Sequence, residues 1–404
     1  MKQKNVLISG AGIAGPVLAW WLVRYGFRPV IIERWPQLRS GGQNIDISGA
    51  AQGIVAKMGL EKDIKAANTR EQGLRFVDHK YKIKAQFPVG KSKNSRGTKE
   101  LEILRGDLAG ILYNNTCQDI EYIFGDEITN IHDDGNKAIV SFLKRADQEF
   151  DIVVAADGVR SKTRTLIFGD DAKLRPLGIY CAYFTIPRAE TDDKWWNWYH
   201  ALGSRSIFLR PDNAGTTRAS LWFLSKPAGY ESLSLNEQKD ILVKKYLNAG
   251  WETQRILEGL RNTNELYFDY ICQVHMPQWR KGRAVLVGDA AYGPSPLSGL
   301  GTTLAFVGAY LLAGELSRHE DYTKSFFAYE ELMRPYVNLA QKLPPGVPRI
   351  AHPKTRFGIY ILHVIAKIAS SEILARRDNG LGRSSADSIN LPDYSLKYDN
   401  IKNN

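Results

Sequence analysis

The opening segment of the chain combines apolar runs with a glycine-rich turn. Residues 4–9 form a short apolar run, and a turn with three glycines leads into an apolar helix pattern that ends near Tyr25. A second apolar run occupies residues 29–33. A strand, a glycine turn, a helix and a strand within about 30 residues predict a βαβ unit, which is the start of a parallel sheet.

Two later apolar runs have the same buried-strand character. Residues 150–157 end at the aspartate of an Asp-Gly pair and residues 283–289 end in Gly-Asp, and the second run leads into a long helix at about residues 301–318. Residues 104–116 also have a helix pattern, with Asp107 in the first turn, where a carboxylate is favourable. Because these strands are far apart in the chain, the predicted parallel sheet is discontinuous.

The chain between these strands has the alternation of an antiparallel sheet. Residues 73–87 alternate between apolar and polar, and residues 121–143 predict a small antiparallel unit. Residues 175–275 are rich in aromatic, alternating segments, with one helix predicted within them. That helix is expected near residues 235–249, and polar loops are expected at residues 37–50 and 88–100.

These patterns predict an α/β fold with three parts. They are a discontinuous Rossmann-like domain, an inserted antiparallel β-sheet domain and a C-terminal helical segment. The predicted Rossmann-like domain consists of residues 1–72, 98–174 and 276–335. The predicted inserted domain consists of residues 73–97 and 175–275, and the C-terminal segment consists of residues 336–404.

Composition and charge favour an enzyme over a nucleic-acid or membrane-surface binder. The 404 residues are 44% hydrophobic, which is enough for a sizeable core. The net charge is +11, but the basic residues are scattered, so a basic enzyme surface that suits anionic cofactors is the simpler interpretation. Cys117, Cys181 and Cys272 have no metal or disulfide spacing, so a reducing compartment is favoured and no metal site is expected.

The amino-terminal segment resembles a signal peptide only superficially. Three glycines interrupt its apolar run, and Arg24 follows without a cleavage site. The longest late apolar stretch, residues 357–369, contains His363 and Lys367 and is too short to span a bilayer. We therefore expect a soluble, cytoplasmic monomer.

The first glycine turn fits the dinucleotide-binding pattern GxGxxG. Gly10 allows the tight turn, Gly12 lets the backbone approach a diphosphate, and Gly15 lets the helix pack closely on the strand. Glu33 ends the second strand and is placed to accept hydrogen bonds from ribose hydroxyls. Its negative charge disfavours a 2′-phosphate, so the turn predicts NAD or FAD without choosing between them.

The two strand-end carboxylates distinguish these cofactors. GxGxxG, a mid-chain Asp157-Gly158 and a late Gly288-Asp289 occur in this order. Their order and spacing resemble the group A flavoprotein monooxygenases, the family of para-hydroxybenzoate hydroxylase, whose layout fits nearly the whole chain. The resemblance implies bound FAD. It also implies that Asp289 holds the ribityl side of FAD, that Asp157 shapes the cofactor groove, and that Arg105 lies beside the flavin.

The proline–glycine turn after the late Gly-Asp pair is implied to face the flavin ring. Pro296, Gly299 and Gly301 would lay backbone N–H groups against the pyrimidine ring, and the following helix N-terminus would stabilise negative charge on reduced flavin. The chain departs from the family at Tyr292, where histidine is common, and at Leu300, where glutamine is common. Both departures are expected to change what the flavin or the substrate touches.

Within that family the sequence most resembles the tetracycline destructases. The resemblance is carried by ERWPQLRSGGQNIDI, ILRGDL, GDAAYGPSPLSG, LAFVGAYLLAGEL and SINLPDY. It implies that Arg39 meets NADPH phosphates, that Asp46 contacts FAD and that Gln43 lies at the flavin–substrate boundary. A solvated loop arginine is the alternative for Arg39. Arg34 and Gly42 complete the predicted cofactor-binding set.

The implied chemistry belongs to the cofactor. NADPH would bind transiently and reduce the flavin, O₂ would give a flavin C4a-hydroperoxide, and oxygen would pass to an electron-rich phenol or enol carbon, which inactivates the antibiotic. No catalytic acid or base of the protein is therefore predicted. The candidates for substrate contact are Gln43, Phe184, Phe208, Arg210, Trp222 and Phe223, and core or sheet packing is the alternative for the last five.

Other readings of the chain stay open at this point. Residues 195–198, WWNW, are similar to part of the WxWxIP motif of flavin halogenases, but Tyr199-His200 replace Ile-Pro, so we reject that motif. Residues 353–377 predict an amphipathic helix, either near the substrate opening or in simple core packing. The rival functions are a hydroxylase of another phenolic or polyketide substrate, a reductase, and a nucleic-acid or membrane-surface binder.

Overall fold

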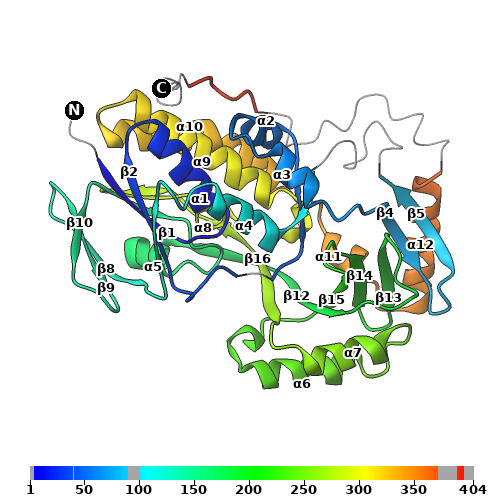
Figure 1. Ribbon diagram of the computed structural model, residues 1–404. Helices are drawn as coiled ribbons and strands as arrows, with labels where there is room; N and C mark the ends of the chain where they lie inside the picture. Colours follow the sequence, from blue (N-terminus) through cyan, green and yellow to red (C-terminus); the bar gives the residue numbers. More distant parts are fainter. Residues whose placement is uncertain (1–3, 40, 90–100, 372–388, 395–404) are drawn as a thin grey trace.

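A six-stranded sheet forms the centre of the Rossmann-like part (Figure 1). The computed structural model describes residues 4–39, 41–89, 101–371 and 389–394. Within these residues the strand order is β17-β18-β11-β1-β2-β7, and all neighbours are parallel except β17 with β18. The strands are β1 (Asn5–Ser9), β2 (Arg28–Glu33), β7 (Glu121–Phe124), β11 (Ile152–Ala155), β17 (Arg280–Lys281) and β18 (Ala284–Leu286).

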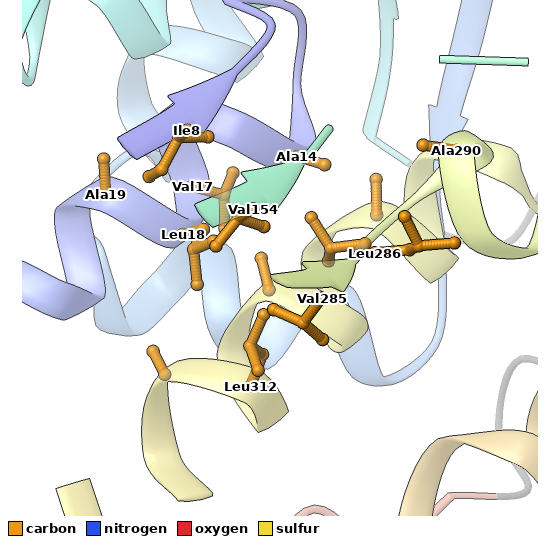
Figure 2. Close-up of a cluster of buried hydrophobic side chains, with 14 of the residues drawn as sticks. Ile8, Ala14, Val17, Leu18, Ala19, Val154, Val285, Leu286, Ala290 and Leu312 are labelled. Carbon is orange, nitrogen blue, oxygen red and sulfur yellow. The ribbon is translucent and has the colours of Figure 1, made fainter. Parts of the chain in front are cut away.

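Three helices pack on one face of this sheet. They are α1 (Ala14–Arg24), α9 (Gly301–Arg318) and α10 (Tyr322–Ala340). Figure 2 shows how Ile8 of β1, Val154 of β11 and Val285 of β18 gather with Leu18 of α1 and Leu312 of α9. All five side chains are buried, and β1 is a continuous apolar run because a central parallel strand is covered on both faces. The three discontinuous apolar runs therefore lie side by side, as the sequence predicts.

A second sheet of seven strands forms the inserted part, in the order β16-β12-β15-β14-β13-β4-β5. Its strands are β4 (Gly73–Val77), β5 (Ile83–Pro88), β12 (Lys173–Pro187), β13 (Trp196–Ala201), β14 (Arg205–Pro211), β15 (Thr216–Leu224) and β16 (Tyr267–His275). All neighbours are antiparallel except β13 with β4, which are parallel. The predicted antiparallel domain is therefore a mixed sheet.

Two helices cover one face of the seven-stranded sheet, where the sequence pattern predicts one (Figure 1). They are α6 (Leu235–Tyr246) and α7 (Thr253–Asn262). A capping box of Ser234 and Glu237 starts α6. Gly259 lets α7 approach the sheet, because a Cβ there would overlap the side chain of Ile186. The opposite face of the sheet borders a cavity and is partly covered by the C-terminal helices.

The remaining elements connect these layers. β3 (Asn44–Ile47) and β6 (Leu101–Leu104) form an antiparallel pair, and β8 (Ile128–Asp133), β9 (Ala138–Phe142) and β10 (Gln148–Phe150) form a small antiparallel sheet. The other helices are α2 (Ala50–Lys57), α3 (Glu61–Ala66), α4 (Arg105–Asn114), α5 (Lys162–Phe168), α8 (Asp289–Tyr292), α11 (Val347–Ala351) and α12 (Arg356–Ala369).

Two local predictions differ from the structure. The segment 37–50, expected to be loop, contains β3, which gains its partner β6 from more than fifty residues away. The strand β7, expected in the small antiparallel unit, instead pairs with β2 in the parallel sheet. Most of the predicted loop 88–100 and most of the polar tail lie outside the described residues.

The predicted domain boundaries remain predictions. Helix α10 continues across the proposed boundary between residues 335 and 336. Strand β12 crosses the boundary between residues 174 and 175 and pairs with β16 from Lys173 onward. In the part of the chain that the structure describes, no helix is both long enough and apolar enough to cross a bilayer.

The close approach of α1 to β1 generates a stability prediction. A Cβ on Gly15 would overlap the carbonyl oxygen of Gly10, whereas a Cβ on Gly110 of α4 would meet no atom within 4 Å. We expect Gly15→Ala to lower the free energy of unfolding by about 1–3 kcal/mol through overpacking. Gly110→Ala should leave it unchanged or raise it by up to about 1 kcal/mol. Urea unfolding of both variants checks this, and equal stability would contradict the proposed contact.

Candidate active site

A cavity of about 1070 Å³ is bordered by both large sheets. One wall comes from the carboxyl ends of β1, β2 and β11, where ligands of open parallel sheets bind. The other wall comes from the face of the seven-stranded sheet that α6 and α7 leave free. The cavity is therefore continuous from the glycine turn to the aromatic residues of the inserted sheet.

The glycine turn forms the start of the cavity. Gly10 has φ of +112°, and a Cβ there would lie 2.7 Å from the carbonyl oxygen of Ala156. Its N–H donates to the carbonyl of Ile32 at 2.7 Å, which fixes the turn between β1 and β2. Gly12 lines the cavity, and a Cβ there would stand 3.4 Å from the Arg105 guanidinium. The turn thus leaves bare backbone beside a cation, which suits a diphosphate.

Glu33 occupies the end of β2 and faces the same cavity. Its Oε2 accepts from the backbone N–H of Ala11 at 2.9 Å, and its Oε1 accepts from the N–H of Trp35 at 3.1 Å. These two bonds hold the carboxylate in place. Each oxygen retains lone-pair capacity for a further donor, such as a ribose hydroxyl.

Arg105 places a cation in the cavity wall. It begins α4, and its backbone N–H donates to the carbonyl of Gln43 at 3.0 Å. Burial lowers the pKa of Arg105, the nearby Arg39 adds to this, and the charges of Asp289 and Glu33 oppose it. Within the described residues no acceptor forms a hydrogen bond with its guanidinium. An anionic group between Gly12 and Arg105 would supply the missing acceptor.

The two strand-end aspartates differ in their partners. Asp157 accepts from the hydroxyl of Ser161 and, at 3.1 Å, from the N–H of Thr163, so it anchors the start of α5. Burial raises the pKa of Asp157, and these hydrogen bonds oppose the shift. Asp289 follows Gly288, and burial raises its pKa while the charge of Arg105 lowers it. Both aspartates line the cavity, and the hydrogen bonds of Asp157 tie it to the start of α5.

The turn before α9 brings backbone donors to the cavity. Gly299 is left-handed with φ of +66°, and Gly301 is the first residue of the helix. A Cβ on Gly301 would stand 3.8 Å from the carboxylate of Asp289, so the two segments adjoin. The first turn of a helix has N–H groups without intrahelical acceptors, and its dipole favours negative charge. This end suits the electron-accepting ring of a flavin.

Most predicted cofactor residues meet at this end of the cavity. The wall includes Gly10, Gly12, Glu33, Arg34, Arg39, Gln43, Asp46, Arg105, Asp157, Asp289, Pro296, Gly299 and Gly301. Gly15 and Gly42 stand behind the wall, where Gly15 packs α1 on Gly10 and Gly42 packs against the Arg105 side chain. The direct contacts of these residues with FAD or NADPH stay predictions.

The predicted substrate residues divide between the two faces of the inserted sheet. Phe208, Arg210 and Trp222 line the cavity, as does Gln43. Phe184 and Phe223 point to the opposite face and pack in the core under α6 and α7. The structure therefore corrects the expectation of substrate contact for these two phenylalanines. Strand alternation separates neighbours such as Trp222 and Phe223 but does not say which one faces the cavity.

Several cavity residues were not predicted. Tyr183, Trp196 and Trp198 line the aromatic wall, and Glu71 and Glu102 line the polar boundary between the two ends. The spacing of two between Trp196 and Trp198 is the signal that places both on one face of a strand. Glu71 has no comparable signal, because it lies in an irregular segment before β4.

The two departures from the family pattern have different positions. Leu300 lines the cavity, as expected. Tyr292 does not: its side chain is buried against α9 and α10, its hydroxyl lies 3.1 Å from that of Tyr329, and a Cβ on Gly308 would overlap it. The expectation that Tyr292 alters flavin or substrate contacts is therefore corrected to a packing role.

Part of the C-terminal helical segment borders the cavity. Val347 and Ala351 of α11 line the cavity. His352 is held by the hydroxyl of Ser206 at 2.7 Å, and His363 of α12 lies 3.1 Å from a ring nitrogen of His200. Helix α12 packs on the sheet through Ala366 and Leu362, and the cavity wall contains residues of α11 but none of α12. The last residues of the predicted helix, 372–377, lie outside the described residues.

The glycine turn, the strand-end carboxylates, the cationic Arg105 and the adjoining aromatic wall define a flavin-dependent oxidoreductase. The chain belongs to the FAD binding domain family, whose model matches residues 3–325. It is 35% identical to the flavin-dependent monooxygenase eupH of Phoma sp, with 98% of each chain covered. These similarities identify the chain as a flavoprotein monooxygenase.

Solved structures agree with this assignment over the full chain. The tetracycline destructase Tet(51) is 32% identical with a TM-score of 0.82, and 97% of this chain and 100% of that chain are covered. The tetracycline destructase Tet(55) is 34% identical with a TM-score of 0.81, and 97% of this chain and 99% of that chain are covered.

The position of Arg105 generates a binding prediction. Removing its guanidinium in Arg105→Ala should cost charged hydrogen bonds to FAD worth about 1.5–3 kcal/mol, which is a roughly 10- to 100-fold rise in the dissociation constant. Quenching of flavin fluorescence on titration of apoprotein measures it. The control is Arg188→Ala, since Arg188 is exposed and outside the cavity. An unchanged dissociation constant of FAD for Arg105→Ala would contradict a contact between Arg105 and FAD.

Proposed function

We propose that this monooxygenase oxidises and inactivates tetracycline antibiotics, with bound FAD and with NADPH and O₂ as co-substrates. The observation that carries the proposal is the single cavity that connects the glycine turn with an aromatic wall of Trp196, Trp198, Phe208 and Trp222. The full-length similarity to two tetracycline destructases supports it. Flat aromatic walls suit a polycyclic phenol, which can stack on them.

The protein residues would position the reactants. FAD, when bound, would supply the electron transfer and the activation of oxygen. Gly12 and Arg105 would hold its diphosphate, Glu33 would accept from a ribose hydroxyl, and the N-terminus of α9 would stabilise negative charge on the ring. The aromatic wall would exclude water and keep the substrate ring at a fixed orientation. We assign no general acid or base among the side chains.

A second candidate is a hydroxylase that acts on another phenolic or polyketide substrate. The similarity to eupH, a flavin-dependent monooxygenase, covers 98% of this chain and is compatible with either candidate. The aromatic wall alone suits either class, because stacking recognises flat rings rather than one ring system.

The two candidates differ in which substrate accelerates NADPH oxidation. We expect purified protein to be yellow, and we expect tetracycline to stimulate NADPH oxidation and to lose its own absorbance in the presence of O₂. NADH in place of NADPH tests the cosubstrate. Stimulation by simple phenols or polyketide phenols, with tetracycline inert, would favour the second candidate and reject the first.

The aromatic wall generates a mutational prediction. Trp198 faces the cavity, whereas its neighbour Tyr199 packs near Trp251 on the other face of β13 and donates to the carbonyl of Ala249 at 2.9 Å. Trp198→Leu should raise the KM for the stimulating substrate by roughly tenfold, which corresponds to about 1.4 kcal/mol of lost stacking. Tyr199→Leu should lower the melting temperature and leave KM unchanged. Equal changes of KM in the two variants would contradict a role of the aromatic wall in substrate binding.

A further inference from the structure

The outer side of α12 is apolar and exposed to solvent. The inner side packs on the seven-stranded sheet, where Leu362 and Ala366 pack with Phe76 and Ala85. The outer side carries six apolar side chains that are each between 38% and 72% exposed, and these are Phe357, Tyr360, Ile361, Val364, Ile365 and Ile368. Their spacing of three and four residues places them in one stripe along the helix. A surface helix of a globular protein usually has one apolar side, so the outer stripe of α12 is not accounted for by the core.

The outer stripe of α12 is open to an approaching surface. Figure 1 shows α12 beside β4 and β5, at the end of the molecule that lies farthest from the six-stranded sheet. Strand β5 is the last strand of its own sheet. No residue of α12 lines the cavity, so the stripe is separate from the candidate active site. A contiguous apolar stripe outside a ligand cavity is typical of a surface that binds another molecule or a membrane.

The chain itself offers little apolar material to cover this stripe. Residues 90–100 and 372–388, which follow β5 and α12 in the sequence, lie outside the described residues. The first of these segments contains no large apolar residue, and the second contains three, which are Ile373, Leu374 and Leu381. A segment that covered six exposed apolar side chains would need more than these, because burial of apolar area is what stabilises such a contact. The partner of the stripe is therefore expected outside the chain.

The segment that carries the stripe is positively charged. Residues 341–371 include five Lys or Arg and no Asp or Glu. On α12, Arg356 and Lys367 point in nearly the same direction, because residues eleven positions apart differ by about 20° around a helix axis. That direction borders the stripe at Tyr360, and Lys354 directly precedes the helix. Cations that border an apolar helix side are typical of helices that bind anionic membranes.

Acidic residues near α12 do not cancel this charge. The strands on which α12 packs, β4, β5 and β13, contain no Asp or Glu. Between β4 and β5, Asp78 forms an ion pair with Lys84 at 2.7 Å, and Lys80 and Lys82 lie in the same connection. The undescribed residues 90–100 have four Lys or Arg and one acid, whereas residues 372–388 have three of each. The surroundings of the stripe therefore carry net positive charge.

A second copy of this chain fits the stripe less well than an anionic surface does. Twofold symmetry, the commonest in homodimers, would bring the same stripe and the same edge of both copies together. The edges with Arg356 and Lys367 would then meet without an acidic residue between them, because residues 341–371 contain none. Like charges across an interface are unfavourable. An anionic lipid surface instead supplies hydrocarbon for the stripe and phosphates for its cations.

We propose that α12 docks this protein on an anionic lipid surface, with its outer stripe inserted at the boundary between headgroups and acyl chains. Arg356 and Lys367, with Lys354 before the helix, would contact lipid phosphates. The 14 residues of α12 span about 21 Å, which is less than the roughly 30 Å of bilayer hydrocarbon, so the helix would lie in the plane of the membrane. This docking goes beyond the proposed function and does not rest on it.

The test uses FAD-loaded, full-length protein and vesicles of two compositions. One kind contains phosphatidylglycerol and phosphatidylcholine, and the other contains phosphatidylcholine alone. Co-sedimentation, with flavin absorbance as the measure of bound protein, gives a partition coefficient for each. We expect roughly tenfold tighter binding to the anionic vesicles at low salt, since each Lys or Arg near an anionic surface contributes to binding. The difference should shrink as salt is added, because salt screens the charges.

Two double variants assign the docking to α12. Phe357→Ser with Ile365→Ser should lower the partition coefficient on anionic vesicles by roughly 10- to 100-fold, because two inserted apolar side chains are lost. Arg356→Gln with Lys367→Gln should lower it by roughly 10- to 30-fold, because two cations are lost. The second variant should leave the weaker binding to phosphatidylcholine unchanged, because its apolar stripe is intact.

The matched control is Leu143→Ser with Leu247→Ser. These two side chains are 60% and 62% exposed and lie outside α12. The control removes a similar amount of exposed apolar surface, so it should bind both kinds of vesicle as the wild type does. Flavin content and circular dichroism verify the fold of each variant. Because Phe357 and Ile365 are exposed, their substitution is compatible with the fold.

Three vesicle results would overturn the proposal. They are no binding of the wild type, equal binding to both kinds of vesicle, and binding that persists in Phe357→Ser with Ile365→Ser. A concentration-dependent dimer in sedimentation velocity, abolished by the same variant and without vesicle binding, would assign the stripe to a second copy. If that variant does not fold, the wild-type comparison of the two vesicle compositions decides alone. Failure of tetracycline to be turned over would reject the proposed function and leave vesicle binding intact, so the two failures are distinguishable.

Discussion

The cofactor end of the molecule depends on how closely three backbone segments approach one another around Gly10. The carbonyl of Ala156 lies 2.7 Å from where a Cβ of Gly10 would stand, and Gly15 of α1 packs on the carbonyl of Gly10. Because no side chain separates them, the carboxyl ends of β1, β2 and β11 reach one edge together. Glu33 and Asp157 can then border a single cavity, although Asp157 follows Glu33 by 124 positions in the sequence.

Features that are local in sequence could be predicted. The GxGxxG turn, the strand that ends at Glu33 and the Gly288-Asp289 turn each carry their geometry within a few residues, since glycine spacing and a strand end are visible without a partner. Pairing between distant segments could not be predicted in the same way. Strand β3 alternates over only four residues, Asn44–Ile47, within a polar and glycine-rich segment, which is too short to identify a strand, and its hydrogen bonds come from β6. Propensity yields to such long-range pairing.

The same distinction explains the substrate end. Alternation along β15 separates Trp222 from Phe223, but both residues are large and apolar, so the sequence cannot tell which one faces the cavity. In the structure, α6 and α7 bury Phe223 on one face of the sheet, and Trp222 lines the cavity on the other face. Tyr292 shows the limit of motif comparison, because its place in a cofactor motif suggested a contact that its packing against Tyr329 excludes.

The two ends of the cavity differ in how their guanidinium groups are paired, and this difference bears on where each ligand would bind. Arg39 and Arg105 place two guanidinium groups at the glycine end of the cavity, where a diphosphate would accept hydrogen bonds from them. At the boundary with the aromatic wall, Arg210 is already paired with Glu71, so an anion that reached this guanidinium would compete with a carboxylate in place. A diphosphate would therefore gain more from Arg105, whose guanidinium has no hydrogen-bond acceptor within the described residues, than from Arg210, which is paired with Glu71. The protein would position both ligands and leave the redox chemistry to the flavin.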